Sequence, residues 1–136
     1  MLREVSEIAN VDKLKFTNEI DAIRNESTML RQKGANIIIV LSHCGLDRDR
    51  VIAHECGDYV DVIVGGHSHS FLFTPANVAA ARVNDRPDGP YPFVLTPKSG
   101  KDRKVLIVHA SAFTKYVGDL RVYFNKGTCF KNLCDY

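Results

Sequence analysis

The chain has 136 residues, 45% of them apolar, and a formal net charge of +2. This length and apolar content suit one ordinary domain with a core and exclude wholesale disorder. The weak charge argues against binding nucleic acid or a membrane surface by charge alone, and no uncharged apolar stretch is long enough to form a transmembrane helix. The first ten residues, MLREVSEIAN, lack the apolar region of a signal peptide.

The first predicted helix follows a polar entry segment that covers residues 1–15. Its pattern begins at Phe16, where Thr17 and Glu19 suit a helix start, and Gly34 is expected to end it. Four apolar residues of this run fall on one face of the predicted helix: Phe16, Ile20, Ile23 and Leu30.

Two apolar runs flank a second predicted helix. The runs NIIIVLS (36–42) and VDVIVGG (60–66) are predicted to be fully buried strands. Between them, DRDRVIAHEC (47–56) is predicted to be helical, with Asp47 as the N-cap and Gly57 as the end. The order strand, helix, strand predicts a βαβ unit with parallel strands and a right-handed crossover.

The remaining chain combines a proline-rich excursion with three short strand candidates. Prolines and turn residues mark 74–92 as a surface excursion. Strands are then predicted in FVLT (93–96), KVLIVHAS (104–111) and DLRVYF (119–124), the last with the alternation of a half-solvated strand. The ending NKGTCFKNLCDY has no periodicity, so residues 126–136 are predicted to be an irregular tail.

The cysteines leave two alternatives open. They are Cys44, Cys56, Cys129 and Cys134. No Cys-x-x-Cys pair occurs, so neither a zinc ribbon nor a thioredoxin motif is supported. Four cysteines allow three disulfide pairings, between which the sequence cannot choose, and the alternative is four free thiols.

Three histidines follow the two apolar runs. His43 comes after the first run, and His67 and His69 come after the second, behind a Gly-Gly pair. Functional groups of a βαβ sheet collect at the carboxyl ends of its strands, so these imidazoles are expected to converge. An extended segment would send His67 and His69 to the same side. Since imidazole binds zinc, manganese and iron-class ions well, all three are predicted to be metal ligands.

Other histidines and two serines have plainer interpretations. His54 lies inside the predicted helix and is interpreted as a surface or packing residue, and His109 as a hydrogen-bonded residue at the edge of the core. Ser42 and Ser68 are poor candidates for a nucleophile because no Gly-x-Ser-x-Gly elbow occurs. The sequence also lacks a P-loop and a Gly-x-Gly-x-x-Gly motif.

Four segments, IIIVLSHCG, YVDVIVGGHSHSFL, GPYPFVL and ASAFTKYVGDLRV, together resemble the metallophosphoesterase domain of the 5′-nucleotidase family. That family includes ecto-5′-nucleotidases and secreted insect apyrases, and the resemblance covers residues 15–124. It implies a four-layer αββα fold and hydrolysis of nucleotides by a metal-activated water. It also implies that His43 and His67 ligate one divalent ion and that His69 ligates the other.

The family's other ligands come from motifs that this sequence lacks. Asp-x-His and Gly-Asn-His-Glu do not occur, and the Gly-Asp pairs at 57–58 and 118–119 follow no suitable strand. The nucleotide-recognition domain of the family is also missing. Residues 1–125 are therefore interpreted as the C-terminal half of a metallophosphoesterase domain, a partial αββα sandwich of the α/β class. We expect no catalytic residue in this chain, at most one of the family's two metal ions, with zinc as that ion, and no AMP hydrolysis by the isolated chain.

Half a sandwich would expose an apolar sheet face and unpaired strand edges, so self-association is expected. The resemblance implies nucleoside 5′-phosphates as substrates and an extracellular or cell-surface location, although the sequence carries no signal peptide or anchor. One alternative is a non-catalytic fragment or diverged paralogue that binds a metal or ligand. Another is a structural or interaction role in which the histidines are relics.

Overall fold

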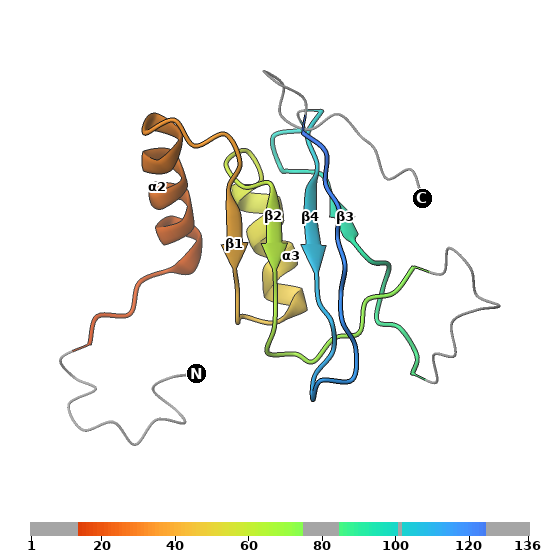
Figure 1. Ribbon diagram of the computed structural model, residues 1–136. Coiled ribbons are helices and arrows are strands. Elements are labelled where there is room, and N and C mark those ends of the chain that lie inside the picture. Colours follow the sequence, from red (N-terminus) through yellow and green to blue (C-terminus); the bar gives the residue numbers. More distant parts are fainter. Residues whose placement is uncertain (1–13, 75–84, 101, 125–136) are drawn as a thin grey trace.

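The computed structural model describes residues 14–74, 85–100 and 102–124. Its elements are α2 (Glu19–Gln32), β1 (Ile39–Leu41), α3 (Leu46–Cys56), β2 (Val62–Val64), β3 (Phe93–Leu95) and β4 (Val105–Val108). The strands form a sheet in the order β1-β2-β4-β3 (Figure 1). β1, β2 and β4 are parallel and β3 runs antiparallel to β4, so the predicted βαβ unit is confirmed. The tail predicted at 126–136 lies outside the described residues.

Helix α2 begins later than its sequence pattern predicted. Asn18 is the N-cap, and its Oδ1 accepts the backbone N–H groups of Ile20 at 2.9 Å and Asp21 at 3.4 Å. An asparagine cap satisfies donors that a helix start otherwise leaves unpaired, so the helix starts at Glu19 and not at Phe16. Phe16 consequently lies outside the helix and is exposed. The expected stop is confirmed, since Gly34 follows the helix with a φ of 93°.

Helix α3 has an N-cap other than the predicted Asp47. The helix begins at Leu46, and its N-cap is Gly45, which has a φ of 89° and no side chain to offer. The missing cap is supplied from elsewhere in the chain, because the Ser68 Oγ accepts the Leu46 N–H at 3.0 Å. The C-terminal end at Gly57 is as predicted.

The core lies between α3 and one face of the sheet. Its buried members alternate along the strands, as a pleated strand requires. They include Ile38, Ile63, Val105 and Ile107 from the sheet side and Leu46, Ile52, Ala53 and Cys56 from α3. Helix α2 adds half-buried Ile20, Ile23 and Leu30 to this cluster. In Figure 1, α3 lies behind the sheet and α2 beside β1. The described residues thus supply one helical layer and one sheet layer, which confirms the mixed α/β class of a partial sandwich.

The opposite face of the sheet is uncovered at β1 and at the end of β2. The paired positions Ile39, Val62 and Leu106, and Leu41, Val64 and Val108, share this face. Ile39 is 57% exposed and Leu41 is 83% exposed. The prediction of a fully buried first strand is therefore wrong, because no described element covers β1 on this side. The expectation of an exposed apolar sheet face is confirmed.

Residues 119–124 cover part of that face without forming the predicted strand. The predicted alternation of buried and exposed side chains is confirmed. Leu120, Val122 and Phe124 pack against the sheet residues Val62 and Leu106. The residues between them are exposed. The segment runs close to β4 in Figure 1, yet it is paired with no strand of the described part. Apolar alternation alone does not make a strand, which also needs a partner for its backbone hydrogen bonds.

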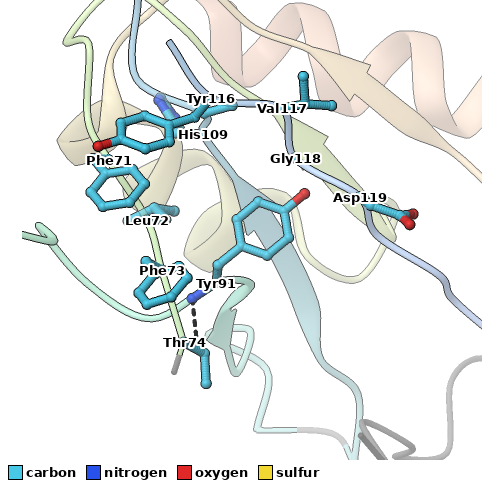
Figure 2. Close-up of a pocket in the computed structure, with 11 residues that line it drawn as sticks. Phe71, Leu72, Phe73, Thr74, Tyr91, His109, Tyr116, Val117, Gly118 and Asp119 are labelled. Atoms are coloured by element: carbon cyan, nitrogen blue, oxygen red, sulfur yellow. Dashed lines mark hydrogen bonds between the residues drawn. The ribbon is translucent and has the colours of Figure 1, made fainter. Parts of the chain in front are cut away.

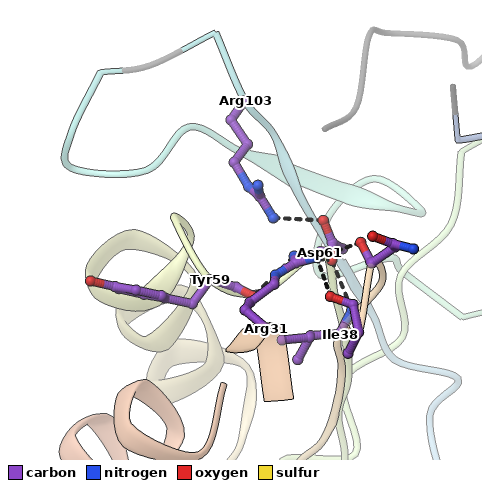
Figure 3. Close-up of polar contacts among 7 residues, drawn as sticks. Arg31, Ile38, Tyr59, Asp61 and Arg103 are labelled. Carbon is purple, nitrogen blue, oxygen red and sulfur yellow. Dashed lines mark hydrogen bonds and ion pairs between the residues drawn. The ribbon is translucent and has the colours of Figure 1, made fainter. Parts of the chain in front are cut away.

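A buried carboxylate ties the amino ends of the parallel strands together (Figure 3). Asp61 is 1% exposed. Its Oδ2 accepts hydrogen bonds from Arg31 and from the backbone N–H of Ile38, both at 2.8 Å, and its Oδ1 accepts one from Arg103 at 2.6 Å. These partners come from α2 and from the segments that lead into β1 and β4. Asp61 therefore ties the end of α2 to the starts of β1, β2 and β4.

The described cysteines are free thiols. Cys44 is exposed and Cys56 is buried. Burial raises the pKa of the Cys56 thiol, which keeps it protonated and unreactive. Cys129 and Cys134 lie outside the described residues, so their pairing stays open. No helix in the described part is long and apolar enough to cross a membrane.

Candidate metal-binding site

Histidines from two neighbouring strands meet at the carboxyl edge of the sheet. Because β1 and β2 are parallel, their carboxyl ends lie at the same edge. His43 follows β1 and His67 follows β2. Their rings are in edge-to-face contact, with centroids 5.2 Å apart and an interplanar angle of 63°. The structure thus brings together two of the three predicted ligands.

The third predicted ligand, His69, is oriented differently. Its ring lies edge-on to Phe113, with centroids 5.2 Å apart. The segment is not extended as predicted, because His67 and His69 both have left-handed backbone conformations, with φ of 78° and 54°. Such values are uncommon for residues other than glycine, and backbone strain of this kind clusters at functional sites.

An aromatic stack holds the chain that follows His69. The Phe71 ring stacks on Tyr116 with centroids 4.2 Å apart, and its backbone N–H donates to Asp88 at 2.7 Å. Beside it lies a pocket of about 260 Å³ (Figure 2). The pocket is lined mainly by carbon atoms of Phe71, Leu72, Phe73, Thr74, Tyr91, His109, Ala110, Tyr116, Val117, Gly118 and Asp119. The stack and the His69–Phe113 contact attach this loop to the segment 113–116.

A buried carboxylate that the sequence interpretation missed lies at the same edge. Asp49, in the first turns of α3, is fully buried. Its Oδ2 lies 2.7 Å from the His109 Nε2, and its Oδ1 accepts a hydrogen bond from the Ser42 hydroxyl. The interpretation of His109 as a hydrogen-bonded residue at the core edge is confirmed.

The sequence did contain a signal for Asp49. Asp49 occupies the position from which Ile52, Ala53 and Cys56 follow at i+3, i+4 and i+7, the spacing of one helix face. A carboxylate on the apolar stripe of a helix indicates a buried, paired charge, since such a group is rarely buried alone. The sequence interpretation named only Asp47 of this helix, as an N-cap, and the fold shows that Asp49 is the buried aspartate.

Gly65 packs directly against the Asp49–His109 pair. A Cβ at Gly65 would overlap both the His109 Nε2 and the Asp49 Oδ2. We expect Gly65→Ala to lower the free energy of unfolding by about 1–3 kcal/mol, the usual cost of overpacking, in a urea titration. Gly66→Ala is the control, because its Cβ would meet the His43 Nδ1 only at 3.1 Å. Equal losses for the two variants would contradict the prediction.

The remaining predicted residues have structural positions. His54 is exposed and its Nδ1 lies 3.3 Å from Glu55, which confirms its interpretation as a surface residue. The Ser42 hydroxyl donates to Asp49, and the Ser68 hydroxyl caps α3. Both serines therefore serve the fold, in agreement with the absence of a nucleophile motif.

The described residues do not form a complete metal site. Among residues 14–74, 85–100 and 102–124, no group of three or more His, Cys, Asp or Glu side chains is placed to hold a metal ion. His43 and His67 would supply two of the about four ligands that a zinc-class ion takes. Asp49 uses both its oxygens in hydrogen bonds, with Ser42 and His109.

Comparison with known proteins places the chain in a family. No protein-family model matches it. It is 44% identical over 126 residues to an apyrase of Aedes aegypti, covering 93% of this chain and 22% of that protein. It is 42% identical over 113 residues to a human 5′-nucleotidase, covering 83% of this chain and 18% of that protein.

A solved structure gives the same result. The 5′-nucleotidase precursor from Thermus thermophilus superposes with a TM-score of 0.58 at 35% identity, over 71% of this chain and 17% of that chain. The chain therefore spans about a fifth of the length of the proteins it matches. On this sequence identity and shared fold, the chain belongs to the 5′-nucleotidase and apyrase family of metallophosphoesterases.

Proposed function

We propose that this chain is part of a metal-dependent phosphohydrolase that acts on nucleotides. The observation that carries the proposal is the contact between His43 and His67 at the carboxyl edge of a sheet whose sequence matches apyrases and 5′-nucleotidases. In this proposal His43 and His67 ligate one divalent ion, zinc, and His69 ligates a second ion in a complete site. A bound ion supplies activation of water and neutralisation of charge on phosphoryl oxygens.

The chain's own contribution is ligand placement, not acid–base catalysis. The proposed substrates are nucleoside 5′-phosphates, and the proposed location is the extracellular space or the cell surface, both from the family. No described residue is assigned a catalytic role. Because the described donor set is incomplete, the isolated chain is expected to bind at most one ion and to hydrolyse AMP no faster than background.

The direct test is zinc binding by the isolated chain, read by competition with a chromophoric chelator at low micromolar protein. His67→Ala and His43→Ala are each expected to weaken binding at least roughly tenfold, since even the partners of metal ligands are worth about that much. His54→Ala is the matched control, an exposed histidine of the same chain. Equal weakening by all three variants, or no zinc binding at all, would contradict the ligand assignment.

A non-catalytic, metal-binding fragment is the second candidate, and the incomplete donor set favours it. Both candidates predict zinc binding and no AMP hydrolysis by the isolated chain, so the mass of the native protein separates them: part of a larger enzyme runs well above 15.2 kDa on an immunoblot, whereas a separate fragment runs at that mass. AMP hydrolysis that a chelator abolishes would reject the non-catalytic candidate and the expected inactivity of the chain.

A further inference from the structure

Asp49 lies where the carboxyl ends of the three parallel strands meet. It reaches the end of β1 through Ser42 and the end of β4 through His109, and it packs on Gly65 at the end of β2. We propose that Asp49, together with His109, is a positioning residue that fixes the turns carrying His43 and His67 relative to each other. Only the metal-binding arm of the test rests on the proposed function.

The first arm of this network holds the turn of His43. The Ser42 hydroxyl donates to the Asp49 Oδ1, and the same Oγ accepts the backbone N–H of Cys44 at 3.2 Å. The Ser42 N–H donates to the Val64 carbonyl at 2.8 Å. The Ser42 side chain therefore bonds the backbone on the other side of His43, at Cys44, and Asp49 orients this side chain. Without Asp49, the Ser42 hydroxyl would be free to rotate away.

The second arm holds the turn of His67. The His109 Nε2 and the Asp49 Oδ2 occupy the space that a side chain at Gly65 would need, so the backbone before His67 rests directly on the pair. The Gly65 N–H donates to the Val108 carbonyl at 2.9 Å. This close approach requires glycine, and it transmits the position of His109 to the β2 turn.

The helix that carries Asp49 is itself attached to the His67 turn. The Ser68 Oγ accepts the N–H of Leu46, the first residue of α3, and lies 2.8 Å from the Ser70 Oγ. The helix start and the histidine turn are thus joined through the Ser68 hydroxyl, which the Ser70 hydroxyl holds in place. A shift of α3 would move both turns, which makes the contact between the His43 and His67 rings depend on this helix.

A buried carboxylate that only stabilises the fold could lie anywhere in the core. Asp61 is a carboxylate of that kind in this sheet. Asp61 ties the amino ends of the same strands, far along the strands from the histidines. Asp49 differs because it bonds Ser42, the residue before His43, and packs against Gly65, two residues before His67. Its loss is expected to loosen this edge locally, whereas loss of an ordinary core contact lowers stability throughout.

The test compares Asp49→Asn with Ile52→Val in the same helix. Amide hydrogen exchange of the metal-free chain, followed by mass spectrometry, is expected to quicken in 41–46 and 65–70 by roughly tenfold or more in Asp49→Asn. Ile52→Val removes one buried methylene and should quicken exchange more evenly. Zinc affinity should fall roughly ten- to hundredfold in Asp49→Asn and stay near wild type in Ile52→Val.

The two readouts keep the two proposals apart. If wild type binds no zinc, the metal assignment fails, while the exchange pattern still decides the role of Asp49. If Asp49→Asn quickens exchange evenly, or not at all, positioning is rejected. If Asp49→Asn does not fold, Ser42→Ala is the second variant. It removes the hydroxyl that bonds both Asp49 and the Cys44 N–H, and it must quicken exchange at 41–46 alone for the proposal to stand.

Discussion

Replacing Asp61 with asparagine is expected to lower the free energy of unfolding by about 3–5 kcal/mol, because it leaves buried guanidinium charge without its partner. Arg103 is almost fully buried and Arg31 is three-quarters buried at its side chain. Since whole domains are stable by only about 5–15 kcal/mol, this loss would consume much of the stability of the chain. A urea titration followed by circular dichroism measures it.

The control for Asp61→Asn is Asp47→Asn in the exposed first turn of α3. The Asp47 side chain is fully exposed and lies 3.7 Å from Arg50. Exposed ion pairs of this kind contribute less than about 1 kcal/mol, so the control should unfold close to wild type. A loss below about 1 kcal/mol in Asp61→Asn would show that the arginines find water when the carboxylate is removed, and that the cluster does not hold the strand starts.

The isolated chain is expected to self-associate through the uncovered sheet face, and charge placed on that face should prevent it. Leu41 and Ile39 project from β1 into solvent. Removing a leucine-sized side chain from water is worth about 1.5–3 kcal/mol, so Leu41→Lys should weaken association roughly ten- to hundredfold. Because Leu41 makes little contact with the core, folding should be unaffected. Sedimentation velocity over a concentration series gives the association constant.

Val51→Lys is the matched control for the sheet face. Val51 is 40% exposed on α3, which covers the other side of the sheet. Val51→Lys introduces the same charge as Leu41→Lys at another exposed apolar position. A general effect of charge on solubility would therefore appear equally in both variants. If Val51→Lys weakens association as much as Leu41→Lys does, the sheet face is not the contact surface.

The sheet has a buried carboxylate at each end of its parallel strands. Asp61 joins the strand starts to two arginines, and Asp49 joins the strand ends to His109 and Ser42. The first arrangement balances charge and should matter chiefly for stability. The second contacts the residues that precede the predicted ligands His43 and His67, so it should chiefly affect the positions of these two side chains. The variants proposed for each end separate these two roles experimentally.

Much of the architecture could be predicted from local sequence. Apolar runs of strand length, joined by an amphipathic stretch that ends at Gly57, predicted the βαβ unit, because periodicity and stop residues act within a few positions of the chain. Parallel pairing then required His43 and His67 to reach the same edge of the sheet. The motifs around these histidines were distinctive enough to indicate the family.

What the sequence could not decide depends on contacts between distant segments. The α3 cap comes from Ser68, which lies 22 positions beyond the Leu46 N–H that it accepts. The burial of Asp49 depends on His109, 60 positions away. The exposure of β1 and the failure of 119–124 to form a strand reflect which elements lie nearby to pair or cover them. Local patterns determine which residues can be buried or paired, and only the tertiary structure decides which of them are, because each such contact needs a partner brought by the fold.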